Sequence, residues 1–208
     1  MSLKNPKKFW ASVSKQYNWL DYILPRNNLK EFYREGFLEA QRLYYFYDKN
    51  STVIDYGCGI GRIIKSIYKD CEKAIGLDIN KDFIIKAKKD TKANNLEFHT
   101  IDEYRTNEIA DFIYCFMVMQ HNDSKNRNKI INNIFNLLKN GGQVIIQFPN
   151  NFSDYYQESD FVHKFSLNEI KEYGKNFKSH KIIEGNLINY AKRVNVTINH
   201  EYFLIAKK

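Results

Sequence analysis

Residues 53–62 (VIDYGCGIGR) place three glycines within five positions, directly behind an apolar run that contains an acidic residue. Glycine permits a tight turn and lets the backbone approach a ligand closely. In an open α/β sheet, ligands bind beyond the carboxyl ends of the strands, and the loop 57–61 follows such an end. The loop is therefore a candidate ligand site, although plain turns between a strand and a helix also use glycine.

Two acidic residues indicate what this loop would hold. Asp78 ends the next apolar run, about twenty residues after the first glycine, where a carboxylate can accept hydrogen bonds from both hydroxyls of a ribose. A dinucleotide is disfavoured, because its fingerprint requires a glycine where this chain has Arg62. Asp55 would also repel a pyrophosphate, since two like charges a few ångströms apart cost about 1 kcal/mol even in water. A ligand with a ribose, an ammonium group and no phosphate fits, and S-adenosylmethionine is such a ligand.

The pattern of apolar residues predicts the elements that position these side chains. Residues 4–48 have aromatic residues and leucines at helical spacing, and from Ser51 on strand-like runs alternate with helix-like runs. We expect strands at residues 52–57, 73–79, 96–100, 110–118, 143–148, 193–198 and 201–207. We expect helices at residues 61–70, 81–94, 123–140 and 166–177. The expected fold is α/β: a doubly wound, mostly parallel, seven-stranded sheet with helices on both faces and an N-terminal helical cap.

Length and composition favour one domain. The chain has 208 residues, of which 43% are hydrophobic and 27% charged. We expect a single domain, residues 1–208, with a helical cap at 1–49, a cofactor-binding half at 50–150 and a substrate-side part at 151–208. The net charge of +8 is compatible with nucleic-acid binding, but no run of five or six like charges occurs, which favours ordinary surface charge.

Targeting signals and metal-ligand spacing are both missing from the sequence. No apolar stretch approaches the roughly 18 residues of a membrane span, and the N-terminus lacks the apolar core of a signal peptide. The three cysteines (Cys58, Cys71 and Cys115) are odd in number and widely spaced. We therefore expect a cytoplasmic protein without a disulfide framework, a metal site or a membrane partner.

Several segments together resemble the class I S-adenosylmethionine-dependent methyltransferases. VIDYGCGIGR is similar to the first motif of that family. Similar segments follow in the family's order over roughly residues 50–175, namely 75–79 (IGLDI), 98–102 (FHTID), 110–121 (ADFIYCFMVMQH), 137–148 (LLKNGGQVIIQF) and 165–173 (FSLNEIKEY). The resemblance implies a Rossmann-like fold, S-adenosylmethionine as cofactor and a methyl-transfer reaction.

The resemblance also implies roles for residues of this chain. The methionine part of the cofactor would be held by the loop residues Asp55, Gly57, Cys58, Gly59 and Gly61. The adenosine part would be held by Asp78 on the ribose, Ile79 on the adenine, and Ile101 and Asp102 at the adenine edge. The amino group would be received by the backbone of Phe116 and Met117. Simpler interpretations stay open: Cys58 can be a small residue that fits, Ile79 and Ile101 can be core, and Asp102 can be an exposed loop acid.

An N-terminal aromatic segment is a candidate cover for this site. Residues 9–24 place apolar side chains at helical spacing, with Tyr17 near one end. One interpretation is that the segment simply packs on the core. The other is that it lies over the open edge of the cofactor site and closes together with the loop 148–161, while the Tyr17 hydroxyl reaches the methionine carboxylate.

The sequence says less about the acceptor and the catalytic base. His121 and His163 are the candidate bases, needed only if the acceptor must lose a proton. The tetrapeptide of amino-adenine methyltransferases and the Pro-Cys pair of cytosine-C5 enzymes are missing from the expected positions. We therefore expect a small-molecule acceptor, methylated at oxygen or nitrogen: a sugar, a nucleotide-linked intermediate or another metabolite. A nucleic-acid or protein acceptor and a non-enzymatic scaffold that binds the cofactor are the alternatives.

Overall fold

The computed structural model describes residues 5–16, 28–89, 91, 93–150, 162–185 and 201–208. The chain forms two compact units, divided between Arg105 and Thr106. Residues 6–105 are called the N-terminal unit below, and residues 106–208 the C-terminal unit. Among the described residues, no helix is both long and apolar enough to cross a membrane.

The N-terminal unit is built on three parallel strands in the order β3-β2-β1. The strands are β1 (Thr52–Tyr56), β2 (Lys73–Asp78) and β3 (Leu96–Thr100). Every residue of β1 is buried, as expected of a parallel strand that is covered on both faces. Asp55 pairs with Gly76, and Asp78 pairs with Thr100. Parallel pairing thus brings the carboxyl ends of β1 and β2, with their acidic residues, to one edge.

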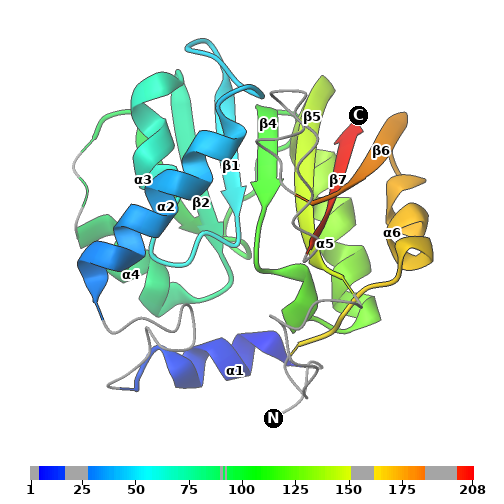
Figure 1. The fold of residues 1–208 in the computed structure, drawn as a ribbon. Coiled ribbons are helices and arrows are strands. Elements are labelled where there is room, and N and C mark those ends of the chain that lie inside the picture. The colour runs from blue at the N-terminus through cyan, green and yellow to red at the C-terminus, as the bar shows by residue number, and fades with distance from the viewer. Residues whose placement is uncertain (1–4, 17–27, 90, 92, 151–161, 186–200) are drawn as a thin grey trace. The chain divides into compact units, whose positions relative to one another are not determined.

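Helices cover these strands (Figure 1). The helices are α1 (Pro6–Val13), α2 (Leu29–Leu43), α3 (Ile64–Ile67), the 3-10 turn η2 (Tyr68–Asp70) and α4 (Lys81–Lys89). α2 begins at Asn28, whose side chain accepts a hydrogen bond from the Lys30 N–H. α2 packs on α3, and α4 packs on β2 and β3. Side chains from three helices meet around the glycine loop in one apolar cluster of Val13, Phe32, Ile60 and Phe83.

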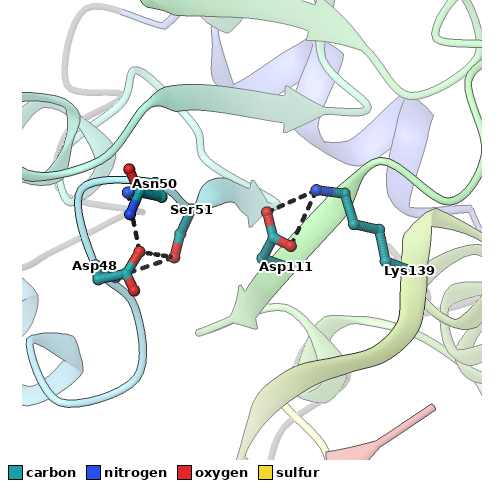
Figure 2. A network of polar contacts seen from close by, with 5 residues as sticks. All are labelled: Asp48, Asn50, Ser51, Asp111 and Lys139. Carbon is teal, nitrogen blue, oxygen red and sulfur yellow. Dashed lines mark hydrogen bonds and ion pairs between the residues drawn. The ribbon is translucent and has the colours of Figure 1, made fainter.

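The turn before β1 is fixed by its own polar side chains, which Figure 2 shows. The Asp48 carboxylate accepts hydrogen bonds from the Asn50 N–H and the Ser51 hydroxyl, both at 2.9 Å. Asp48 N–H in turn donates to the Ser51 hydroxyl oxygen at 3.0 Å. This local network holds the start of β1, at the end of the strand opposite to the glycine loop.

The C-terminal unit contains four strands in the order β4-β5-β7-β6. They are β4 (Ala110–Cys115), β5 (Leu138–Pro149), β6 (Ser179–Glu184) and β7 (Glu201–Lys207). β4 and β5 are parallel, whereas β7 runs antiparallel to both β5 and β6. An ion pair joins Lys139 of β5 to Asp111 of β4, with N–O distances of 2.9 and 3.0 Å (Figure 2).

Helices of the C-terminal unit start at capping residues that the sequence displays. They are the 3-10 turn η3 (Met119–His121), α5 (Ser124–Leu137) and α6 (Leu167–Gly174). The Asp123 side chain caps α5, and Ser166 with Glu169 forms a capping box at α6. α5 packs on β5, and α6 packs on β6 and β7 (Figure 1).

The predicted α/β fold with a mostly parallel sheet is confirmed, and the seven strands of the described residues make a mixed sheet because β7 is antiparallel. Strand β6 was not predicted, and the predicted strand at 193–198 lies outside the described residues. β5 begins at Leu138 instead of 143, because a register shift opposite Ala110 accommodates the extra residues before Gln143. The helix predicted at 61–70 shortens to α3 and η2. The predicted single domain with its three parts stays a prediction.

Candidate functional site

The glycine loop is fastened to the neighbouring strand by its backbone. The N–H groups of Gly57 and Cys58 both donate to the Leu77 carbonyl oxygen, at 2.7 and 2.9 Å. Gly57, Gly59 and Gly61 all have positive φ, at 91°, 55° and 84°, a region that side chains other than glycine rarely adopt. The sequence therefore needs glycine at these positions for the turn itself.

Gly59 and Gly61 differ in what surrounds them. A Cβ added at Gly59 would meet no atom within 4 Å, so this glycine borders open space. A Cβ added at Gly61 would lie 2.8 Å from the Phe98 ring, so this glycine is required for packing against β3. Of the two, Gly59 is the position where a ligand can approach the backbone.

Asp78 lies at the centre of this site. Its side chain is buried at the end of β2, and its two carboxylate oxygens accept hydrogen bonds from the N–H groups of Gly59 and Asn80, each at 2.8 Å. Burial raises the pKa of Asp78 to about 6, although the backbone hydrogen bonds oppose this shift. At neutral pH the carboxylate is ionised and retains lone pairs for a ligand that donates hydrogen bonds, such as a ribose.

A second acid and a thiol lie close to Asp78. Asp55 is 4% exposed near the end of β1, and Cys58 is 6% exposed in the glycine loop. Burial raises the pKa of the Cys58 thiol well above its ordinary value, and the carboxylates of Asp55 and Asp78 raise it further. Cys58 therefore stays a neutral thiol, which excludes a thiolate nucleophile here and matches the interpretation of a small residue that fits.

The three remaining predicted cofactor residues of the N-terminal unit line the same edge. Ile79 follows Asp78 and is partly buried, and the Ile101 N–H donates to the Asp78 carbonyl oxygen at 2.9 Å. Asp102 is exposed and forms an ion pair with Lys7 of α1. The structure thus brings Ile79 and Ile101 next to Asp78, and their contacts with a cofactor stay a prediction.

Helix α1 is attached beside Asp78 by Asn80. The Asn80 side chain donates from Nδ2 to the Trp10 carbonyl oxygen at 2.6 Å, and its Oδ1 accepts from the N–H of Asp82 at the start of α4. Ser14 just after α1 donates to the Asp82 carboxylate at 2.9 Å. Residues 9–13 of the predicted cover therefore pack on the core, partly through Val13, and lie next to the glycine loop. Tyr17 and most of the loop 148–161 lie outside the described residues.

In the C-terminal unit, the end of β4 has an unusual backbone. Met117 adopts a φ of 59°, and its N–H donates to the Gln147 side-chain oxygen at 3.0 Å. Gln147, in turn, donates to Glu201 of β7 at 2.5 Å. A residue other than glycine at positive φ is strained, and such strain is typical of functional sites. The polar residues that hold Met117 in place come from β5 and β7.

The two candidate histidines lie near this turn. His121 ends η3 and is partly buried. The His163 backbone N–H donates to the carbonyl oxygen of Gln120, the residue before His121, at 2.9 Å, so the two histidines lie on neighbouring segments. His163 Nε2 lies 3.0 Å from the Glu169 carboxylate. Burial favours a higher pKa for Glu169, but hydrogen bonds from Ser166 and His163 bring its pKa below the ordinary value. Glu169 therefore stays ionised and orients the His163 ring.

Sequence reasoning missed three polar residues of these segments. Asn80 precedes α4 with the spacing of an N-cap, so the capping rule would have found it. Glu169 stands three residues after Ser166, the spacing of a capping box, but this spacing does not indicate that it is also the partner of His163. Gln147 had no signal, because its role depends on pairing between distant strands. In the described part of the chain, no group of three or more histidine, cysteine or acidic side chains could hold a metal ion.

Comparison with known proteins gives a family. The sequence model of a family described as a methyltransferase domain matches residues 47–197. No curated protein matches the sequence. A structure described as a SAM-dependent methyltransferase from Archaeoglobus fulgidus is similar with a TM-score of 0.67 and 17% identity, over 93% of this chain and 100% of that chain.

Two structures of phosphoethanolamine N-methyltransferase 2 from Haemonchus contortus are also similar. Their TM-scores are 0.64 and 0.63, with 17% and 16% identity over 84% of this chain. This chain spans about half of each, 52%. One is a complex with phosphomonomethylethanolamine and S-adenosylhomocysteine, and the other with S-adenosyl-L-methionine. At this identity the likeness shows the fold, and the cofactors bound by those proteins agree with the one predicted from the sequence.

Proposed function

Because the chain belongs to the methyltransferase-domain family, we propose that it transfers a methyl group from S-adenosylmethionine to the oxygen or nitrogen of a small molecule. One observation carries this proposal: the buried Asp78 carboxylate accepts a hydrogen bond from the N–H of Gly59, a glycine of the loop that borders open space. This arrangement supports the proposal, because an acceptor for ribose hydroxyls would lie directly beside a backbone that a ligand can approach.

The residues of the N-terminal unit fit an adenosine ligand with an ammonium group. Asp78 would accept hydrogen bonds from the ribose hydroxyls, and the neighbouring Ile79 and Ile101 would pack on the adenine, with Asp102 at its edge. Asp55 and the loop Gly57–Gly61 would hold the methionine part, where a nearby carboxylate favours an ammonium group and disfavours a phosphate. When bound, S-adenosylmethionine supplies an electrophilic methyl group on a sulfonium.

Two residues predicted to receive the amino group of the cofactor, Phe116 and Met117, belong to the C-terminal unit, and this role stays a prediction. Met117 has a positive φ, and its N–H donates a hydrogen bond to the Gln147 side chain. The backbone carbonyl oxygens of Phe116 and Met117 are therefore the groups that would accept hydrogen bonds from the amino group of the cofactor. Tyr17 remains a candidate contact to the carboxylate.

His163 is the better supported base. The Glu169 carboxylate is within hydrogen-bond distance of the His163 Nε2 atom, which leaves Nδ1 as the nitrogen that would remove a proton from the acceptor. His121, which ends η3, is retained as the second candidate. Holding the acceptor in line with the methyl group would supply roughly 7–11 kcal/mol of the barrier reduction even without a base.

A small-molecule acceptor is supported by the similar structures, one of which holds a small phosphorylated amine. A small-molecule acceptor also agrees with the sequence, which has no run of like charges of the kind that binds nucleic acid. A cytoplasmic location remains our expectation.

Binding of methyl-labelled S-adenosylmethionine to the purified protein, measured by calorimetry with NAD as a negative control, tests the cofactor. Incubation with a cell extract that has been separated into low-mass and macromolecular fractions then tests the acceptor. We expect label in the low-mass fraction. Label in RNA, DNA or protein would shift the proposal to the macromolecular alternative, and no cofactor binding would favour a scaffold.

A further inference from the structure

Arg127 is a buried cation in the C-terminal unit whose charge is only partly satisfied. The side chain lies in the first turn of α5 and is 6% exposed. Its Nε and Nη1 atoms are buried and have no hydrogen-bond partner among the residues that the structure describes. The ion pairs described in this unit join Lys139, His163, Lys175 and Lys208 to acidic residues, and none of them includes Arg127. A buried guanidinium without an anion is costly, so this side chain calls for a physical reason.

The contacts that Arg127 does make are with aromatic side chains. Its guanidinium carbon lies 4.9 Å from the centre of the Phe165 ring. The guanidinium group also forms a hydrogen bond with the Tyr173 hydroxyl. Phe148 stacks on Tyr173 and packs edge-on against Phe165, so the guanidinium rests on a group of three aromatic rings. A desolvated cation over a ring gains about 2 kcal/mol or somewhat more, which offsets only part of the several kcal/mol that the desolvation of a full charge costs.

This position is close to the residues already assigned to the acceptor. The His163 ring packs edge-on against Phe165, the ring on which the Arg127 guanidinium lies, with 4.7 Å between the ring centres. His163 is bonded through its backbone to Gln120, and Phe165 through its backbone to Pro149 at the end of β5. Gln120 is 1% exposed, and in the described part of the chain its side-chain oxygen also has no hydrogen-bond partner. Arg127 thus belongs to the cluster of residues at the ends of β4 and β5.

We propose that Arg127 binds an oxyanion of the methyl acceptor, either a phosphate ester or a carboxylate. An oxyanion would satisfy the open N–H groups with charge-assisted hydrogen bonds, the strongest kind available to a guanidinium. The inference rests on the proposed function and narrows its substrate class to anionic small molecules. Because Nε and Nη1 are buried, the anion enters with a local movement of the side chains that cover them.

Thermal unfolding in the presence of inorganic phosphate or acetate tests this assignment. At ten times its dissociation constant, a bound anion should raise the unfolding temperature by roughly 3–6 °C. If only phosphate raises the unfolding temperature, the oxyanion of the acceptor is a phosphate ester. If only acetate raises it, the oxyanion is a carboxylate. In Arg127→Met the shift should vanish, whereas Lys129→Met, which removes an exposed charge from the same helix, should keep it. No shift in the wild-type protein, or an equal shift in Arg127→Met, would overturn the proposal.

The same variants distinguish a binding residue from a structural one. If Arg127 is held ready for a ligand, Arg127→Met removes an uncompensated buried charge and should unfold at the same or a higher temperature in anion-free buffer. A clearly lower temperature would identify Arg127 as a structural brace and refute the inference. Should Arg127→Met fail to fold, the Nε–H resonance of Arg127 in the wild-type protein, assigned with Arg127→Lys, must still move as phosphate is added. Binding of S-adenosylmethionine, measured separately, should be unchanged in Arg127→Met, so failure of the cofactor assignment and failure of this one are separable.

Discussion

The proposed contact between Asp78 and the ribose gives cofactor binding a pH dependence that can be measured. Its pKa of about 6 means that the carboxylate is protonated in most molecules at pH 5 and ionised in nearly all at pH 8. A ribose hydroxyl donates its hydrogen bond best to the ionised form. The affinity for S-adenosylmethionine should therefore be about tenfold lower at pH 5 than at pH 8, in proportion to the ionised fraction.

Replacing the carboxylate with an amide removes this titration. Asp78→Asn should weaken cofactor binding at pH 8 by about 1.5–3 kcal/mol, because the charge is lost and the amide NH2 group must face one of the two backbone N–H groups, of Gly59 or Asn80, that donate to the carboxylate. The dependence on pH between 5 and 7 should disappear in the same variant. Glu72→Gln, which removes an exposed charge just before β2, is the matched control and should bind as the wild type does. Isothermal titration calorimetry at pH 5, 6, 7 and 8 measures both quantities.

Stability without cofactor should change in the opposite sense. The pKa of Asp78 is higher in the folded protein than in the unfolded chain, so its contribution to stability is present below about pH 4 and is lost as the pH rises through about 6. The loss from this group amounts to about 3 kcal/mol between these limits. Denaturation in urea from pH 4 to 7 should show it in the wild type and not in Asp78→Asn. An affinity that is independent of pH, or unchanged in Asp78→Asn, would refute the assignment of the ribose contact.

Three other substitutions test neighbouring parts of the structure. Gly59→Val should lower cofactor affinity more than tenfold, because the valine side chain would fill the open space through which the ligand approaches the loop. The Gly141→Ala variant, whose glycine also has positive φ and open space around it, should bind the cofactor as the wild type does; calorimetry measures both affinities. Asn80→Ala should lower the free energy of unfolding by about 1–2 kcal/mol through loss of the α4 cap, and increase hydrogen exchange at residues 9–13. Once an acceptor is known, His163→Asn should reduce turnover by roughly 10²–10⁴-fold with cofactor affinity unchanged. A larger loss in His121→Asn would reverse the choice of base.

The parts of this fold that the sequence predicts are those with a strong local signal. β1 and β2 are apolar runs that end near acids, and α5 and α6 directly follow Asp123 and Ser166, residues of the types that cap helices. Strand β6 lacks such a signal, since its first three residues are exposed and its place is set by antiparallel pairing with β7. A strand at the edge of a sheet buries little, so its composition resembles that of a loop.

Site residues divide in the same way. Asp78 was a candidate because it ends an apolar run behind the glycine loop, and the structure supplies two amide donors to its carboxylate, whereas its contact with a ribose stays a prediction. The support of Met117 by Gln147 depends on the strand order and could not be read from neighbouring residues. Arg127 had no signal either, because an arginine in a helix is ordinarily exposed, and only the packing of Phe165 over it makes its charge conspicuous.

Asp78 and Arg127 share a physical property that bears on function. Each is a buried ionisable side chain, in a different unit: burial raises the pKa of Asp78, and two nitrogen atoms of Arg127 have no hydrogen-bond partner among the described residues. Sequences that optimise stability alone would replace such residues with apolar ones of similar size. Their charges are complementary to different ligand groups, since a carboxylate accepts from hydroxyls and a guanidinium donates to an oxyanion. A stability that rises on removing either charge, together with the loss of one ligand and not the other, would show that both were retained for binding.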